Sequence, residues 1–329
     1  SSCLSLWEHN IAYEENDAQV IDQLQAAYPR FCIHPDVRLL CEQLFPGRAG
    51  LPFVSDAAAR RAVEYVRHAG GHSAALQPIP HQPCTAVAVD PSEFPLLKQY
   101  WQHSGELISS RVARSILDGT VVTASPTNAR SLVQQRVADL HATSPQNVLL
   151  FPSGMGAISA AWRAVQATHP DPPTCQFGFP YVDTLKIQER FPGADRDFLP
   201  MGTSDDAVRL DELFPERRFS AVFCETPTNP LLVTPDLRLL REITQQHQAV
   251  LIVDDTLRAC SRQTVLPDCD IVVTSLTKDF SGYGNVLAGA LILNPGSPHH
   301  ESLRAALTRD FEESLSDLDV EILELNSRD

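Results

Sequence analysis

From residue 147 onward, short apolar runs alternate with segments in which apolar residues recur at helical spacing. The apolar runs are rich in Val, Ile, Leu and Phe, which is typical of strands buried on both faces. Residues 158–169, 182–190 and 237–247 carry apolar side chains three and four positions apart and are predicted helices. This alternation predicts a mostly parallel sheet that is covered by helices. The candidate strands are residues 147–152, 176–179, 219–225, 249–254, 270–275 and 288–294.

The beginning of the chain has a different pattern. Apolar residues recur at helical spacing in residues 17–28, 35–45 and 55–68, and Ser55 offers a side-chain cap for the third segment. Residues 70–91 are rich in Gly, His, Gln and Pro, which favours an extended connection. We therefore expect a helical start to the chain that ends in a linker.

A division into three parts follows from these patterns. Residues 92–140 again predict helices, with a break near residues 120–126. We expect an N-terminal helical extension and linker over residues 1–90, and an α/β domain with an N-terminal dimerisation arm over residues 91–296. Residues 297–329 are expected to be the start of a further, incomplete region.

Composition narrows the class of protein. The chain has 329 residues and a formal charge of −15, from 41 acidic against 26 basic side chains. This argues against nucleic acid and anionic membranes as main partners. We find neither an apolar run long enough to cross a bilayer nor a signal sequence. Eight cysteines without a CxxC pair and eleven histidines without an HExxH array disfavour zinc and disulfides. We expect no metal and a reducing, cytoplasmic compartment.

Lys278 is the most informative residue. It follows the apolar run 270–274, precedes a glycine-rich turn and has hydroxyl neighbours at Ser275 and Thr277. A free lysine has a pKa of about 10.4, so its amine attacks carbonyl groups only when desolvation lowers that value. The pattern predicts a buried lysine that forms a Schiff base. The alternative is a strand-end lysine that points into solvent.

A glycine turn offers a site for an anion. Phe151-Pro-Ser-Gly-Met-Gly-Ala-Ile158 is predicted to be a strand end, a turn and a helix start, where free main-chain N–H groups gather. Taken alone it is equally compatible with an ordinary strand-to-helix turn. The hydroxyls of Ser275 and Thr277 could complete a phosphate cup from the other side.

A second strand ends in two acids. Asp254 closes an apolar run, and a buried carboxylate without a cationic partner is unfavourable. A protonated pyridine nitrogen would supply that cation, whereas Asp255 points to the opposite face of the sheet. The Tyr181 ring could stack on such a heteroaromatic group or could be an ordinary core residue. Asn229 could donate to a phenolate oxygen of the same group.

Four motifs occur in one order: Ser-Gly-Met-Gly-Ala-Ile at 153–158, Glu-Thr-Pro-Thr-Asn-Pro at 225–230, Val-Asp-Asp-Thr at 253–256 and Ser-Leu-Thr-Lys at 275–278. Together they resemble the cysteine/methionine-metabolism family of pyridoxal-phosphate enzymes of fold type I, in particular its cystathionine γ-synthase group. Residues 28–34, 100–111 and 278–286 resemble the fungal type, which has a long N-terminal extension.

The resemblance implies a fold-type-I α/β core with a seven-stranded sheet and pyridoxal 5′-phosphate as cofactor. In the wider family a Tyr-x-Arg element of a neighbouring subunit reaches the phosphate. Here Ser109-Ser-Arg111 lacks the tyrosine but keeps the arginine. Because that arginine would reach the phosphate of a neighbouring subunit, we expect a homodimer or tetramer. The resemblance implies that Lys278 forms the Schiff base with the cofactor and that Asp254 pairs with its ring nitrogen. It implies that Tyr181 stacks on the ring and that Asn229 contacts its 3′ oxygen. The residues implied to bind the phosphate are Gly154, Met155, Ser275, Thr277 and Arg111.

The resemblance also implies a reaction. We expect γ-replacement on an O-acyl-homoserine, most simply with cysteine as nucleophile, so the partners are small amino-acid substrates. The alternatives are an O-acetylhomoserine sulfhydrylase, a γ-lyase, carbon–carbon bond formation in secondary metabolism, or a catalytically impaired relative. The family continues into a C-terminal domain whose arginine binds the substrate carboxylate. This chain ends at Asp329 without a candidate for it, so we expect that region to be incomplete.

Overall fold

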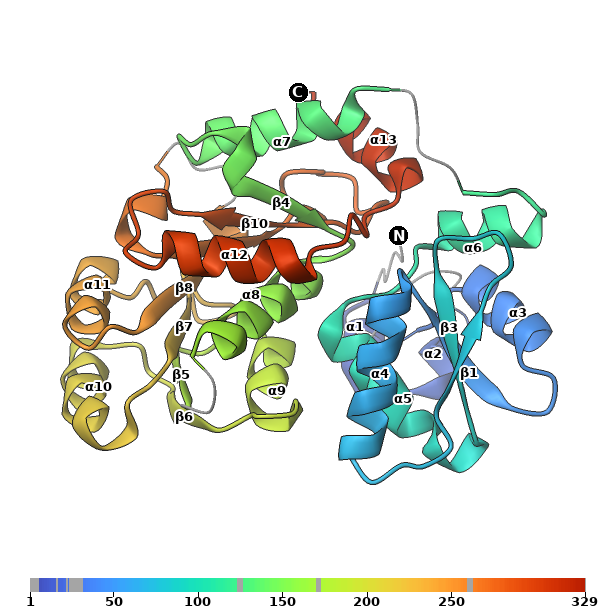
Figure 1. Ribbon diagram of the computed structural model, residues 1–329, viewed down its shortest axis with the longest axis horizontal. Helices are drawn as coiled ribbons and strands as arrows, with labels where there is room; N and C mark the ends of the chain where they lie inside the picture. The colour runs from blue at the N-terminus through green and yellow to red at the C-terminus, as the bar shows by residue number, and fades with distance from the viewer. Residues whose placement is uncertain are drawn as a thin grey trace. The chain divides into compact units, whose positions relative to one another are not determined.

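The computed structural model describes residues 6–15, 17–21, 23, 32–122, 127–169, 173–258 and 263–328. The chain forms two compact units (Figure 1). The first comprises residues 1–102 and 107–124, and the second comprises residues 103–106 and 125–329. The boundaries of these units differ from residues 90 and 296, which separate the three expected parts. The expected division into an extension, an α/β domain and a further region stays a prediction.

The second unit is built on a seven-stranded sheet. Antiparallel pairing is confined to β10, which runs against both of its neighbours, and the other pairs are parallel. The predicted mostly parallel seven-stranded sheet is therefore confirmed. The strand order is β4 (Val148–Phe151), β10 (Gly289–Leu293), β9 (Ile271–Ser275), β8 (Val250–Asp254), β7 (Ala221–Glu225), β5 (Thr174–Phe177) and β6 (Arg196–Leu199).

Helices cover both faces of the sheet. Successive side chains of a strand point to opposite faces, so one strand contacts helices on both sides. Leu251 and Val253 of β8 lie in a cluster with apolar residues of α7 (Ala129–Leu140), α10 (Ser204–Arg217), α11 (Leu237–Gln246) and α13 (Asp317–Asn326). Ile252 lies between them in sequence and lines a small cavity with Ile158 of α8 (Gly154–Thr168). Beside α8 lie α9 (Val182–Arg190) and α12 (His300–Asp310). Strands β7, β8, β9 and β10 are thus buried on both sides, which explains their continuous apolar sequences.

The first unit contains a sheet that the sequence did not predict. Its antiparallel strands lie in the order β1 (Ala49–Phe53), β3 (Thr85–Val89) and β2 (Ala75–Pro78). The expected all-helical segment and the linker over residues 70–91 were therefore wrong. Pro52 and Pro78 lie in the two edge strands, where proline is tolerated, yet in sequence they indicate turns. The edge strand β6, with its charged start, was missed as well.

The predicted helices of this unit are confirmed where the structure describes them. These are α3 (Pro35–Leu44) and α4 (Asp56–His68), and Ser55 caps α4 by accepting a hydrogen bond from the Ala58 N–H. The predicted helix over residues 17–28 is described only as α2 (Ala18–Ile21), because most of its remainder lies outside the described residues. The remaining helices are α1 (Trp7–Glu14), α5 (Phe94–Ser104) and α6 (Ser110–Leu117).

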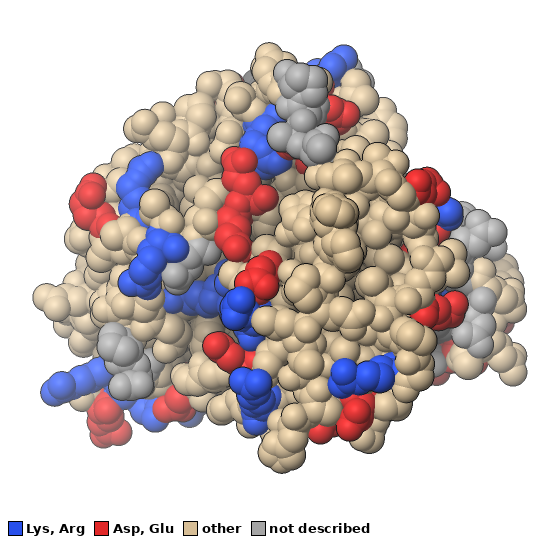
Figure 2. All heavy atoms as spheres, turned by 45° about the vertical axis from the view of Figure 1, so that its right-hand side comes forward, with Lys and Arg blue, Asp and Glu red and all other residues tan. Residues whose placement is uncertain are grey.

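Charge is spread over the face of the molecule that Figure 2 shows. On the face in Figure 2, acidic and basic side chains are interspersed between wide uncharged areas. In the part of the chain that the structure describes, no helix has the length and apolar character needed to cross a bilayer.

Candidate active site at the carboxyl edge of the sheet

Three predicted site residues meet at the carboxyl edge of the central strands. Asp254 ends β8 and Ser275 ends β9, and these strands are parallel neighbours. The turn before α8 reaches the same edge, because a Cβ atom added to Gly154 would lie 2.9 Å from the Ser275 Cβ. The structure therefore brings Gly154, Asp254 and Ser275 together, as expected of the carboxyl ends of parallel strands.

The start of α8 presents unused main-chain donors. Ser153 caps the helix: its hydroxyl accepts from the Gly156 N–H at 3.0 Å, and its carbonyl accepts from the Ala157 N–H at 3.2 Å. Among the described residues, no acceptor contacts the N–H groups of Gly154 and Met155. Two free donors at the positive end of a helix dipole form a site for an anion such as a phosphate.

Residues 103–106 pack on this helix start. Gly105 has a φ of +64°, and a Cβ atom there would lie 2.2 Å from the Ser153 hydroxyl, so both backbone and space require glycine. Its carbonyl accepts from that hydroxyl at 2.8 Å. His103 and the buried Asp183 of α9 are joined at 2.8 Å. Sequence reasoning used this segment only for the family resemblance and missed its contacts.

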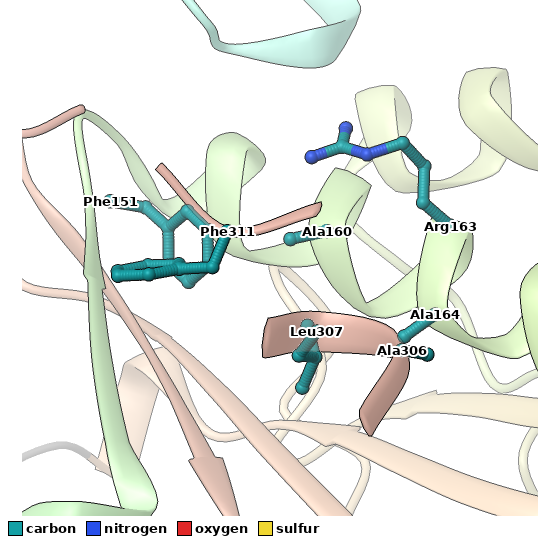
Figure 3. Close-up of a pocket in the computed structure, with 7 residues that line it drawn as sticks. All are labelled: Phe151, Ala160, Arg163, Ala164, Ala306, Leu307 and Phe311. Carbon is teal, nitrogen blue, oxygen red and sulfur yellow. The ribbon is translucent and has the colours of Figure 1, made fainter. Parts of the chain in front are cut away.

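Glu106 anchors the same segment through Arg163 of α8. The guanidinium forms an ion pair with the buried Glu106 carboxylate at 3.1 Å. Figure 3 shows this guanidinium turned away from the apolar side chains where α8 and α12 pack. Their packing leaves a cavity of only about 10 Å³, lined by Phe151, Ala160, Arg163, Ala164, Ala306, Leu307 and Phe311.

Thr256 links two site residues, and sequence reasoning did not single it out. Its main-chain N–H donates to the Asp254 carboxylate at 3.0 Å, and its hydroxyl accepts from the Ser275 N–H at 2.9 Å. Thr277, by contrast, donates its hydroxyl proton to the Ala288 carbonyl at 3.3 Å and accepts from the Ala288 N–H at 3.1 Å. Its hydroxyl therefore joins two segments of the backbone, and its phosphate role stays a prediction.

Lys278 corrects one expectation, because its side chain is exposed rather than buried. The strand ends at Ser275, three residues earlier, and Lys278 lies in a turn where its carbonyl accepts from the Gly282 N–H at 2.8 Å. A side chain on such a turn projects beyond the apolar layer of the sheet. Lys278 therefore lies three residues after Ser275, outside the core.

A pair of acids lies at the end of β7 and β8, with Glu225 buried and Asp254 partly buried. Glu225 is paired in register with Asp254, and its carboxylate accepts from the N–H groups of Tyr181 at 2.6 Å and Asn229 at 2.9 Å. Burial raises the pKa of Glu225 to about 8, and repulsion by Asp254 adds to the effect. Burial likewise raises the pKa of Asp254, against the hydrogen bonds from Thr256. No lysine or arginine of the described residues contributes to either shift.

Asp255 faces away from this pair. Its carboxylate lies 3.9 Å from the His141 imidazole, at the end of α7 on the other side of the sheet. Burial, and then the charge of Asp254, raise the pKa of Asp255 to about 7. The opposite orientation of Asp254 and Asp255 agrees with the expectation from strand alternation.

These residues fit a phosphorylated heteroaromatic cofactor with a protonated ring nitrogen. The free N–H groups and Ser275 suit the phosphate. The buried Glu225 and the partly buried Asp254, without a cationic partner in the described structure, suit the ring nitrogen. Tyr181 precedes α9 and Asn229 follows β7, so both belong to loops at this edge. Arg111 lies in α6 of the first unit. The described residues contain no cluster of His, Cys, Asp and Glu that could hold a metal.

Comparison with known proteins gives two family matches. The model described as Cys/Met metabolism PLP-dependent enzyme matches residues 119–316, and that described as fungal trans-sulfuration enzyme, N-terminal domain, matches residues 37–109. A cystathionine gamma-synthase of Neurospora crassa is 26% identical to this chain, over all of this chain and 74% of that protein. A cystathionine gamma-synthase of Saccharomyces cerevisiae is 29% identical, over all of this chain and 75% of that protein. The cystathionine gamma-synthase-like protein ankD of Aspergillus thermomutatus is 30% identical, over all of this chain and 68% of its own length.

A solved structure shares the fold. Cystathionine gamma synthase from Xanthomonas oryzae pv. oryzae, in complex with aminoacrylate and cysteine, aligns with a TM-score of 0.50 at 22% identity. The alignment covers 61% of this chain and about half, 51%, of that one.

Proposed function

The chain belongs to the Cys/Met metabolism PLP-dependent enzyme family, and we propose that it catalyses γ-replacement on an O-acyl-homoserine. Its cofactor is therefore pyridoxal 5′-phosphate, as the motifs of the sequence implied. The observation that supports the proposal most is the meeting of Gly154, Asp254 and Ser275 at one edge of the sheet. That edge offers free N–H groups and an acid without a cationic partner in the described structure, which supports the binding of this cofactor.

In this proposal the chain holds the cofactor at both ends. The N–H groups of Gly154 and Met155 and the hydroxyl of Ser275 bind the phosphate, with Thr277 beside them. Asp254 binds the ring nitrogen and keeps it protonated. The proposed ring contacts are Tyr181 on the face and Asn229 at the 3′ oxygen.

A neighbouring subunit completes the phosphate site in this proposal. A phosphate dianion in a protein with a charge of −15 is stabilised by a guanidinium. Arg111 matches the arginine of the family's cross-subunit element, so the working unit is at least a homodimer. The proposed role for Lys278 is to join the cofactor to the chain.

When bound, pyridoxal phosphate supplies an electron-poor ring that stabilises negative charge next to the substrate amine. Lys278, once released by the substrate amine, removes the proton at Cα and moves protons at Cβ. The acyloxy group leaves from Cγ as a carboxylate, and a thiolate adds at the same carbon.

The nucleophile defines the second candidate. The ankD protein, whose name is only "cystathionine gamma-synthase-like", is 30% identical to this chain, against 26% and 29% for the two cystathionine gamma-synthases. The alternative is γ-substitution by another nucleophile, sulfide or a carbon acid, because it uses the same ring chemistry. The same arrangement of Lys278 and Asp254 would serve each nucleophile.

Product analysis tests the proposal. The cofactor-loaded protein is incubated with O-acetyl- or O-succinyl-homoserine and, separately, with cysteine, sulfide and a carbon acid. Cystathionine formed with cysteine supports the first candidate, and a substituted product with another nucleophile supports the second. Release of 2-oxobutanoate alone would identify a lyase, and the absence of any product from either ester would refute γ-replacement.

A further inference from the structure

One carboxylate ties together two loops of the proposed cofactor site. Glu225 is 5% exposed at the end of β7. One of its oxygens accepts from the Tyr181 N–H at 2.6 Å, in the loop between β5 and α9. The other accepts from the Asn229 N–H at 2.9 Å, in the loop that follows β7. The two residues expected to contact the ring and its 3′ oxygen are therefore fixed by a single side chain.

The surroundings of Glu225 are apolar or neutral except for one acid. It lines a small cavity with Ile158 of α8, Thr184 of α9 and Gln176 of β5, none of which titrates. Cys224 lines it too, and burial with two nearby carboxylates raises the pKa of that thiol well above the neutral range. The charged neighbour is Asp254, its partner in register on β8.

Two neighbouring carboxylates in such surroundings resist double ionisation, because each negative charge disfavours the other and burial disfavours both. The raised pKa of Glu225, about 8, is consistent with this. At neutral pH the pair therefore carries one negative charge rather than two, which matches the single positive charge of a protonated ring nitrogen.

We propose that Glu225 is a positioning residue for the cofactor, which fixes the Tyr181 and Asn229 loops and shares one proton with Asp254. This inference rests on the proposed function, because it assigns Asp254 to the ring nitrogen. Glu225 itself acts through the main chain of the two loops and through the charge of Asp254.

The first arm of the test measures cofactor binding. Glu225→Gln leaves one acceptor oxygen and places an amide N–H₂ against the second loop, so one loop loses its anchor. Titration of the cofactor-free protein with pyridoxal phosphate should give a Kd about tenfold higher than wild type. The visible circular dichroism of the bound cofactor should also weaken. Asp255→Asn, which removes a neighbouring buried acid that binds neither loop, should change Kd by less than about twofold.

The second arm measures proton sharing without the cofactor. An acid whose pKa rises from 4.5 to about 8 on folding binds more protons when folded, so stability falls as pH rises through that window. Urea unfolding of cofactor-free protein at pH 5.5 and 8.5 should show this fall in wild type and a smaller fall in Glu225→Gln. The change in slope near pH 7 should correspond to about one proton fewer taken up on folding.

The outcomes separate the two claims. If Glu225→Gln keeps the wild-type Kd, dichroism and pH slope, the inference is overturned. If wild type binds no pyridoxal phosphate, the proposed function fails, and the proton sharing is judged by the urea arm alone. If Glu225→Gln does not fold, Glu225→Asp replaces it: it keeps the charge and both oxygens on a shorter side chain. It should keep the pH slope while raising Kd, and an unchanged Kd would overturn the positioning role.

Discussion

The acids at the two ends of the parallel strands in the seven-stranded sheet differ in their partners. At the amino edge, Asp270 precedes β9 and is fully buried. Its carboxylate forms an ion pair with Arg241 at 2.6 Å, accepts from the Leu251 N–H at 2.8 Å and accepts from the Ser297 hydroxyl. At the carboxyl edge, Glu225 and Asp254 lie side by side, and no cation of the described residues contributes to their pKa values.

The difference separates structural acids from functional ones. An acid with a cation and two further donors within the same chain is satisfied when the protein folds. A pair of acids without a cation keeps an unfavourable charge that a ligand can relieve, and such strained groups are typical of binding sites. The amino edge should therefore control stability and the carboxyl edge should control cofactor chemistry.

The largest expected effect is on turnover. Asp254→Ala removes the proposed partner of the ring nitrogen and should slow turnover about a thousandfold, a loss of roughly 4 kcal/mol. The cofactor-free protein should be no less stable at pH 8, because Glu225 loses a repelling neighbour. Steady-state kinetics and urea unfolding measure the two effects. Equal losses of turnover in Asp254→Ala and Asp255→Ala would contradict the assignment of the two faces.

The next effect belongs to the amino edge. Asp270→Asn leaves the buried Arg241 guanidinium without its counter-charge and should lower the free energy of unfolding by about 3 kcal/mol. The folded fraction should still bind pyridoxal phosphate with wild-type affinity, since Asp270 lies at the far edge. Urea unfolding with a parallel cofactor titration checks both points. A variant of unchanged stability but weakened binding would reverse the comparison.

A smaller effect concerns pH. The pKa of Asp255 rises from 3.8 to about 7 on folding, so the folded state binds the extra proton and stability falls as pH rises between these values. Asp255→Asn should remove about 2 kcal/mol of the fall between pH 5 and pH 8. Thermal or urea unfolding of the cofactor-free protein across this range measures it. A variant with the full wild-type fall would show that Asp255 ionises normally in the fold.

The smallest effect tests the contribution of a second subunit. Arg111→Ala should raise the Kd for pyridoxal phosphate about tenfold, roughly 1.4 kcal/mol, if its guanidinium reaches a neighbour's phosphate. Arg114→Ala is the matched control, because Arg114 lies in the same helix and pairs with Asp36 of its own unit. A purely monomeric protein, or equal effects of the two variants, would contradict the cross-subunit role.

The sequence predicted those parts of the fold that follow from local pattern. Continuous apolar runs identified six strands of the large sheet, and the rule for parallel strands brought Asp254 and Ser275 to one edge. The edge strand β6 was missed because it starts with charges, and β1 and β2 were missed because they contain prolines. The apolar β3 was missed because it lies in a segment rich in Gly, His, Gln and Pro. All four short strands gain stability from pairing with distant segments. The start of α4 was predicted from the Ser55 cap, whereas α8 starts at Gly154, four residues before the predicted helix 158–169.

The candidate site was predictable only in part. Residue types and order indicated Gly154, Asp254 and Ser275, but the two hydrogen bonds to Glu225 depend on loops that meet only in the folded chain. The contact of Gly105 with Ser153 spans 48 residues and likewise has no local signal. The exposure of Lys278 depends on where β9 ends, and strand ends are the least certain feature of a sequence pattern.

One measurement tests the central claim most directly, namely that the carboxyl edge near Ser275 holds a covalently bound cofactor. The protein is saturated with pyridoxal phosphate, reduced with borohydride, digested and mapped by mass spectrometry, with Lys278→Ala as control. We expect a pyridoxyl group on Lys278 and none in the control. A label on another lysine, or no label on protein shown to hold the cofactor, would contradict the account.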